Sequence, residues 1–415
     1  MMYSIAIDFG GTKIKGAIVD GKGKIYTTCR IPTEAQKGSG RIIANLTKVI
    51  KFLSDSFETE LKAKREAPAR KMQADFDALK QKLKLPSDSD FLSHIELPQI
   101  RMPKEIARLQ LKKSDMDVIF RAFELRITGV GISMPGFTDK CGKVIFGGGT
   151  LTSLVGINLK KDLEERVKFP VFIENDANCF ALAEAVHGAG KRHNIVLGVI
   201  WGTGIGGGLV IERRIYSGAF KDGLEFGHMV IDPTITSGVR CGCGQYGCLE
   251  MLASGKNISR RYYEFGGKLK NAGAREVYLS REPAAKKALA DAIHYLGIGL
   301  ADLVNAFNPE VIVMGGSVSR FPNSVYGRLK KEVKKYALPM LTKNLHIVRY
   351  KISADEGILG AAEVVRYSTQ PRIDEAAYDF SKSMSSVKTF DDFKRILRER
   401  GASFDGAIRK LARGK

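Results

Sequence analysis

The sequence predicts an α/β protein that is built from two related domains. Short apolar strand patterns alternate with segments of helical periodicity along most of the chain. A strand, a glycine loop containing threonine and a second strand occur at residues 3–19 and again at residues 195–212. Because glycine loops let backbone N–H groups approach a phosphate, this repeated unit indicates two halves that hold a nucleotide between them.

Composition and length allow a large core. The chain has 415 residues, of which 44% are apolar, and this is enough for two domains. No segment has the pattern of a signal peptide, and glycines interrupt the longest apolar stretch, residues 195–211. The cysteines outside residues 241–248 are scattered without a pairing pattern, which fits a reducing compartment. We therefore expect a cytoplasmic protein that does not engage a membrane.

The formal net charge of +21 raises the question of a nucleic-acid ligand. Residues 60–126 hold 15 Lys/Arg and 11 Asp/Glu, and residues 367–415 hold 11 and 7, so each segment carries only +4. The rest of the charge is spread along the chain, and no basic stripe with interleaved aromatic residues is present. This distribution favours attraction of small anions such as nucleotides and argues against specific nucleic-acid binding.

The first glycine loop follows the strand pattern of residues 3–9. It offers close backbone approach, a hydroxyl and a cation to a phosphate, and the strand before it ends in a carboxylate suited to the hydrated Mg²⁺ that accompanies ATP. The residues concerned are Gly10, Gly11, Thr12, Lys13 and Asp8. An ordinary hairpin has the same short pattern, and this stretch alone does not decide between the two interpretations.

A change of character follows the helical pattern of residues 41–57. Residues 58–126 are charged and helix-prone, and no catalytic constellation occurs among them. We interpret them as an inserted helical hairpin, either a lid or a subunit contact. The strand pattern resumes at residues 127–134, and residues 159–167 predict a helix.

An acidic residue follows the predicted strand of residues 170–173. Asn175 and Asp176 stand at the carboxyl end of this strand, immediately before a predicted helix over residues 177–187. Ligands of open α/β sheets bind at the carboxyl ends of strands, so Asp176 is a candidate for chemistry. The simpler alternative is that Asp176 is only the N-cap of the helix, and the local pattern by itself favours that alternative.

The second glycine loop carries Thr203 and Gly204 as phosphate candidates. Helical patterns then cover residues 250–266 and 283–307, and a short strand over residues 311–314 leads into Gly315 and Gly316. These two glycines permit close approach of a flat or anionic ligand, which suggests the adenosine side of the nucleotide site. A plain strand-to-helix turn explains them equally well.

Half of the six cysteines fall within eight residues. Cys241, Cys243 and Cys248 are interleaved with glycines, and His228 lies shortly before them. Three thiolates and one imidazole complete a closed tetrahedral zinc site, which is structural rather than catalytic. Three small buried cysteines without a metal are the alternative, but the intervening Gly-Gln-Tyr-Gly is too polar for a core segment, so zinc is favoured.

Taken together and in this order, the motifs resemble those of the ROK family of sugar kinases and repressors. The resemblance covers residues 3–57 and 127–366, and the loop of residues 225–250 is its most specific part. It implies an actin-like ATPase fold, a duplicated ribonuclease H-like arrangement. Residues 58–126 and 367–415 have no counterpart in the family pattern, and we expect them to form a helical insertion and a C-terminal helical extension. We therefore expect a first domain 1–174 with insertion 58–126, a second domain 175–350 with zinc loop 225–250, a helix 351–366 returning to the first domain, and a basic extension 367–415.

The resemblance also implies roles for single residues. Asp176 matches the general base of the family, Asn175 a sugar-binding neighbour, and Glu225, His228 and Glu250 residues around the sugar. The two glycine loops match the phosphate loops, and Asp8 matches the magnesium-linked acid. The implied activity is ATP-dependent phosphorylation of a hexose or amino-sugar, of glucokinase type at the 6-hydroxyl, in a homo-oligomer that is a dimer or tetramer.

Two points stay open at this stage. Residues 147–158 lack the Asn-Leu…Trp run of many glucokinases in the family, so the sugar is not specified, and some relatives of this fold use polyphosphate in place of ATP. The alternative function is that of a sugar-sensing regulator that binds ligand without turnover. Family repressors carry a helix-turn-helix before the first phosphate loop, whereas only a few residues precede that loop in this sequence, so we expect an enzyme.

Overall fold

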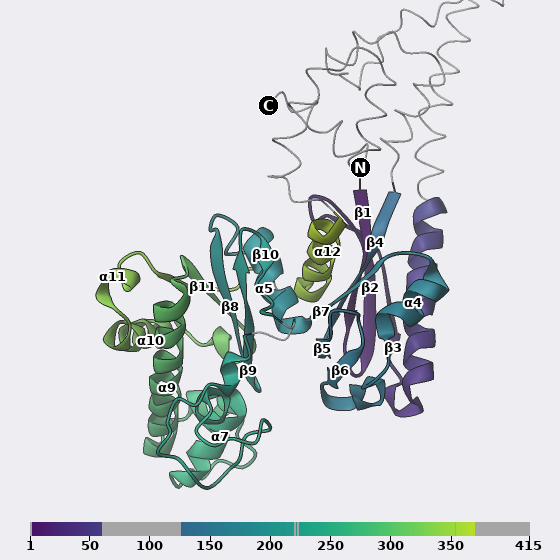
Figure 1. Cartoon of the computed structure of the whole chain (residues 1–415). Coiled ribbons are helices and arrows are strands. Elements are labelled where there is room, and N and C mark those ends of the chain that lie inside the picture. The colour runs from purple at the N-terminus through teal and green to yellow at the C-terminus, as the bar shows by residue number, and fades with distance from the viewer. Residues whose placement is uncertain (1, 60–125, 220, 222–223, 353, 370–415) are drawn as a thin grey trace, which may run out of the picture.

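The computed structural model describes residues 2–59, 126–219, 221, 224–352 and 354–369 (Figure 1). Residues 60–125 and 370–415, which contain nearly all of the predicted insertion and of the predicted extension, lie outside the described residues.

The first half of the chain forms a five-stranded sheet with the order β3-β2-β1-β4-β7. Its first three strands are antiparallel, and β4 and β7 run parallel to β1. The bounds are β1 (Met2–Phe9), β2 (Lys13–Asp20), β3 (Ile25–Pro32), β4 (Arg126–Met134) and β7 (Val171–Asn175). The helix of residues 39–59 and α4 (Leu159–Val167) share one apolar core with this sheet, because their periodic apolar side chains are buried together against β1 and β2. A small hairpin of β5 (Gly136–Thr138) and β6 (Val144–Gly147) follows β4.

The second half repeats this plan with the sheet order β10-β9-β8-β11-β12. Again three antiparallel strands come first, and two strands parallel to β8 follow. The bounds are β8 (Ile195–Trp201), β9 (Ile205–Ile211), β10 (Arg214–Ile215), β11 (Val311–Gly315) and β12 (His346–Arg349). Two sheets of equal strand order and direction confirm the predicted α/β class and the duplicated ribonuclease H-like arrangement.

Most of the remaining helices belong to the second half. They are α6 (Leu249–Ala253), α7 (Gly255–Glu264), α8 (Ala274–Leu279), α9 (Pro283–Phe307), α10 (Asn323–Tyr336) and α11 (Pro339–Thr342). The prediction of one helix over residues 250–266 is wrong, because the backbone at Ser254 is extended and the Gly255 N–H donates to the Gly202 carbonyl at 2.7 Å. α10 was not predicted from the sequence, although Val325, Leu329 and Val333 repeat at helical spacing and are buried.

Two helices lie between the sheets, α5 (Asp176–Val186) and α12 (Glu356–Thr369) (Figure 1). They pack against each other, α12 also packs on β1 and β4, and α5 packs on β8 and β9. The two helices approach closely, since a Cβ at Gly360 would lie 2.1 Å from the Cys179 carbonyl oxygen. The helix predicted over residues 351–366 begins five residues later and continues to Thr369. Among the described helices, none combines the length and apolar composition needed to cross a membrane.

Glu184 ties α5 to the segment that leads into α12. Its carboxylate is fully buried and accepts backbone hydrogen bonds from Ala189 at 2.7 Å, Lys351 at 3.0 Å and Ile352 at 2.7 Å. Glu184→Gln would turn an NH₂ group toward one of these donors, so we expect it to lower the free energy of unfolding by roughly 1.5–3 kcal/mol. Urea denaturation followed by tryptophan fluorescence measures this change, with Glu165→Gln on the exposed side of α4 as the control. Equal midpoints for the two variants would refute the assigned role of Glu184.

Candidate active site

Asp176 lies at the carboxyl end of β7, as the first residue of α5. The N-cap is Asn175, whose Oδ1 accepts the N–H groups of Ala177 at 2.9 Å and Asn178 at 3.2 Å. The alternative interpretation of Asp176 as the N-cap is therefore wrong, because Asn175 caps the helix instead. Asn175 also donates from Nδ2 to the Gly136 carbonyl at 3.3 Å, which fixes the strand end against β5.

The environment of Asp176 is unusual for an aspartate at a helix start. The side chain is exposed, yet protein atoms crowd around it closely enough for desolvation to raise its pKa. The Ala177 N–H lowers the pKa through a 2.9 Å hydrogen bond, and the negative charge of Asp8 raises it further. Asp176 and Asp8, which are far apart in the sequence, therefore lie within electrostatic reach of each other.

Asp8 stands near the end of β1, beside Lys15 of β2 and Ser133 of β4. Burial raises the pKa of Asp8, whereas the charges of Lys13 and Lys15 lower it. The carboxylate also lies against the start of α12, because a Cβ at Gly357 would be 2.8 Å from Asp8 Oδ1.

Two further acidic residues lie beside Asp8, at the start of α12. Asp355 forms an ion pair with Lys15, and its charge raises the pKa of Asp8. Glu356 has a buried oxygen, Oε2, without a hydrogen-bond partner among the described residues. Burial raises the pKa of Glu356, and the negative charge of Asp8 raises it further. A group of carboxylates with an unpaired buried oxygen fits the oxygen ligands and water shell that Mg²⁺ prefers, so these residues fit the predicted metal.

The loop between β1 and β2 is held in a tight turn by its carbonyl groups. Gly10 N–H donates to the Lys13 carbonyl at 2.9 Å, and the Thr33 hydroxyl donates to the Gly10 carbonyl at 2.6 Å. The Thr150 hydroxyl donates to the Gly11 carbonyl at 3.1 Å. Within the described part of the chain, no hydrogen bond occupies the N–H groups of Gly11 and Thr12. The loop therefore presents unpaired amides together with the exposed Lys13 side chain, as a phosphate loop requires.

The corresponding loop between β8 and β9 is bound to the end of the predicted zinc loop. Glu250 of α6 accepts the Ile205 N–H at 2.9 Å. A Cβ at Gly204 would lie 2.4 Å from the same carboxylate, so a larger residue there would have to displace Glu250. The backbone carbonyl of Thr203 lies 3.4 Å from the Lys256 amide. Glu250 thus links two predicted sites, one for phosphate and one for sugar.

Gly315 and Gly316 end β11 in very close packing. A Cβ at Gly315 would lie 2.3 Å from the ring of Phe180, and one at Gly316, which has a φ of 85°, would lie 2.5 Å from the Trp201 carbonyl oxygen. Tight packing therefore accounts for both glycines, and the interpretation as an adenosine site stays a prediction.

The predicted metal ligands come together. His228, Cys241, Cys243 and Cys248 each offer a donor atom, and these atoms all lie within 4.8 Å of one another. His228 Nδ1 is 3.3 Å from Cys241 Sγ, and Cys243 Sγ is 3.6 Å from Cys248 Sγ. Tetrahedral zinc with Zn–S bonds of about 2.3 Å and Zn–N bonds of about 2.0 Å spaces its ligands about 3.5–3.8 Å apart, so the donor set fits this metal.

The second nitrogen of His228 faces a carboxylate. Nε2 lies 3.6 Å from Glu225 Oε2, while Nδ1 faces the cysteines. A histidine that binds metal through one nitrogen commonly presents the other to a carboxylate, which fixes the ring orientation. The half-exposed Glu225 carboxylate is therefore linked to the thiol cluster through one imidazole ring.

Sequence reasoning missed several residues of this site. Lys15 and Asp355 pair across 340 positions of the chain, which no local pattern can reveal. Glu174 accepts hydrogen bonds from the Asn175 N–H at 2.9 Å and from Asn178 Nδ2 at 3.0 Å, and it holds the turn into α5. The Asp-Glu-Gly start of α12 is visible in the sequence, and its position after a strand was the signal that could have indicated a ligand-binding role.

The repeated sheet and the two glycine loops define a protein of the actin-like ATPase fold. The ROK family model matches residues 99–368, which is more than half of the chain. The chain belongs to the ROK family.

Relatives of known name agree with this assignment. A glucokinase from Thermotoga maritima is 32% identical over 252 residues, which is 57% of this chain and 78% of the glucokinase. A xylose repressor from Bacillus spizizenii is 32% identical over 239 residues, 58% of this chain and 61% of the repressor. Among solved structures, a ROK hexokinase from Thermus thermophilus superposes with a TM-score of 0.65 at 28% identity, covering 88% of this chain and 99% of the hexokinase.

Proposed function

We propose that the protein transfers a phosphoryl group from ATP to the 6-hydroxyl of a hexose or amino-sugar. It is a sugar kinase of the ROK family. The observation that carries the proposal is the convergence of Asp176 and Asp8, which lie at the carboxyl ends of two parallel strands, β7 and β1, beside unpaired loop amides. A base for the acceptor and a carboxylate for the donor's Mg²⁺ are what phosphoryl transfer to an alcohol requires.

Asp176 is the proposed general base. A sugar hydroxyl is a poor nucleophile, and a carboxylate within hydrogen-bond reach assists its deprotonation as the phosphoryl group moves. We assign sugar contacts to Asn175, Glu225, His228 and Glu250. The exposure of Asp176 and Glu225 supports this assignment, because their oxygens remain accessible to a ligand.

The donor side consists of the two glycine loops and the acidic residues around Asp8. Mg²⁺, when bound, would neutralise part of the phosphate charge. Asp8 is the proposed link to that ion or its water shell, and the amides of Gly11 and Thr12 with Lys13 would face the phosphates. Thr203 and Gly204 are the proposed phosphate contacts of the second half. Gly315 and Gly316 are proposed on the adenosine side.

Zinc is the proposed structural metal of the loop over residues 225–250. Its four ligands would be His228, Cys241, Cys243 and Cys248. Because His228 and Glu225 face each other and Glu250 follows Cys248 closely, the metal would hold the sugar-binding side chains in position. Three thiolate ligands fit a reducing compartment, and we propose a cytoplasmic location and a homo-oligomeric state, a dimer or tetramer.

The test of the activity is sugar-dependent release of ADP from Mg-ATP. The acceptors are glucose, fructose, mannose, N-acetylglucosamine and N-acetylmannosamine, and polyphosphate replaces ATP in a parallel series. We expect turnover with at least one of these sugars. Sugar binding without consumption of ATP or polyphosphate would instead favour the sugar-sensing regulator. The similarity to a xylose repressor supports that alternative.

The titration of Asp176 provides a second test. Because burial and the charge of Asp8 raise the pKa of Asp176, the acid limb of kcat/KM is expected at a higher pH than for an ordinary aspartate. The base acts when deprotonated, so activity falls as the pH decreases through this pKa. Carboxyl ¹³C NMR, with Asp176→Asn to assign the signal, should show a lower pKa in the Asp8→Asn protein. An unchanged Asp176 pKa in that variant would contradict the proposed coupling.

A further inference from the structure

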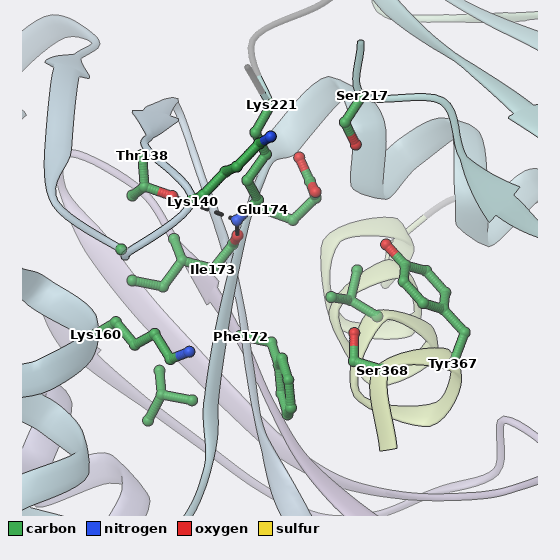
Figure 2. Close-up of a pocket in the computed structure, with 13 residues that line it drawn as sticks. Thr138, Lys140, Lys160, Phe172, Ile173, Glu174, Ser217, Lys221, Tyr367 and Ser368 are labelled. Atoms are coloured by element: carbon green, nitrogen blue, oxygen red, sulfur yellow. Dashed lines mark hydrogen bonds between the residues drawn. The ribbon is translucent and has the colours of Figure 1, made fainter. Parts of the chain in front are cut away.

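A cavity of about 280 Å³ lies beside β7, the edge strand of the first sheet. None of the site residues predicted from the sequence lines it. Its walls come from both halves of the protein, since β5, α4, β7 and α12 meet Ser217 and Lys221 of the segment that follows β10 (Figure 2). The cavity therefore bridges the two halves at a place separate from the Asp176 site.

Three lysines line this cavity, Lys140, Lys160 and Lys221. Lys221 Nζ donates to the Ile173 carbonyl at 2.7 Å and lies 3.4 Å from the Thr138 hydroxyl, as the dashed lines in Figure 2 show. Lys160 extends from α4 toward β7, and its ammonium is 4.0 Å from the Glu164 carboxylate. No hydrogen bond or ion pair of the Lys140 ammonium occurs within the described part of the chain.

The cavity carries a net positive charge, although Glu164, just outside the wall, pairs with Lys160 at 4.0 Å. Glu174 is the one acidic residue in its wall, and this carboxylate already accepts hydrogen bonds from the Asn175 amide and from Asn178. Arg214 adds a fourth positive charge next to the wall, because its guanidinium lies 5.6 Å from the centre of the Tyr367 ring. An excess of ammonium groups around a small concavity, among them that of Lys140, which is unpaired within the described residues, attracts a compact anion.

The other lining groups suit a ligand that carries hydroxyls. Thr138, Ser217, Tyr367 and Ser368 each bring a hydroxyl to the wall, and Phe172 brings an aromatic ring. The volume is near the lower end of the range of about 300–1,000 Å³ for small-molecule sites, which suits a small metabolite better than a nucleotide.

We infer that this cavity binds a small phosphoryl-bearing metabolite, with the phosphate among Lys140, Lys160 and Lys221. A ligand in this place contacts both halves of the protein and lies against Ile173 and Glu174, the residues immediately before Asn175 and Asp176. Its binding therefore acts on the relative position of the halves and on the strand end that carries the proposed base.

Isothermal titration calorimetry tests the inference with two probes, glucose 6-phosphate and inorganic phosphate, which distinguish a sugar phosphate from the bare anion. The choice of glucose 6-phosphate rests on the proposed function, but the binding measurement needs no turnover. We compare the wild-type protein with Lys140→Gln/Lys160→Gln, in which neither residue belongs to the proposed active site. The control is Lys143→Gln/Lys161→Gln, which removes the same charge from exposed neighbours that do not line the cavity.

We expect at least one probe to bind the wild type and the control equally, and to bind the Lys140→Gln/Lys160→Gln protein at least about tenfold more weakly. Absence of binding by both probes would overturn the inference. Equal binding by all three proteins would overturn it as well, because the phosphate would then occupy another site, such as the active site. If the probes bind in the expected pattern but the protein turns over none of the sugars, the inference about the cavity stands. Only the proposed function is then refuted.

Discussion

Asp176→Asn is expected to lower kcat by a factor of about 10²–10⁴, the contribution of a positioned general base. Asparagine keeps the size and the hydrogen-bonding capacity of the side chain, so the Ala177 N–H at the start of α5 retains an acceptor. It cannot accept the proton of the sugar hydroxyl, and it removes a negative charge. The measurement is steady-state ADP release at saturating sugar and Mg-ATP.

The control for this substitution is Asp55→Asn, on the exposed surface of the helix of residues 39–59, which we expect to behave as the wild type. Thermal unfolding and zinc content should be equal in all three proteins, because the Asn175 cap that begins α5 is unchanged. Retention of wild-type turnover by a folded Asp176→Asn protein would exclude Asp176 as the base.

Cys248→Ser is expected to have the second large effect. Removing one of three thiolates should abolish stoichiometric zinc binding, because a serine hydroxyl is a poor zinc ligand. Structural zinc contributes about 10–16 kcal/mol in zinc-finger peptides, so the loop over residues 225–250 should lose its fixed conformation. Since Glu225 and His228 then lose their fixed positions, we expect KM for the sugar to rise by an order of magnitude or more.

The control for the metal is Cys141→Ser, which changes an exposed free cysteine outside the cluster. Atomic absorption should find one zinc per chain in the wild type and in this control, and none in Cys248→Ser. A metal-free wild-type protein with normal sugar turnover would show that the four residues form a packed thiol cluster without a metal.

Local patterns were sufficient for the parts of the site that are local in sequence. The thiols Cys241, Cys243 and Cys248 lie within eight residues, and the structure brings them together with His228 as their spacing predicts. The two glycine loops each join adjacent antiparallel strands, so a turn of a few residues defines them. The repeated strand order follows from that same unit occurring twice.

Features that depend on distant contacts could not be predicted in this way. Asn175 and Asp176 are adjacent, and either is a good N-cap by type, so only the backbone geometry shows that Asn175 has this role. The pairing of Lys15 with Asp355 and the cavity beside β7 each require segments that are far apart in the sequence. The break at Ser254 depends on a hydrogen bond to Gly202, across the glycine loop of the second sheet.

The most direct test of the central claim is identification of the product by ³¹P NMR after incubation with Mg-ATP and the preferred sugar. Transfer to the 6-hydroxyl predicts a phosphomonoester signal that couples to the two C6 protons, formed in equal amount to ADP and formed about 10²–10⁴-fold more slowly by Asp176→Asn. Inorganic phosphate in place of a sugar phosphate, or a phosphate coupled to a single sugar proton, as at C1 of an aldose, would contradict the account.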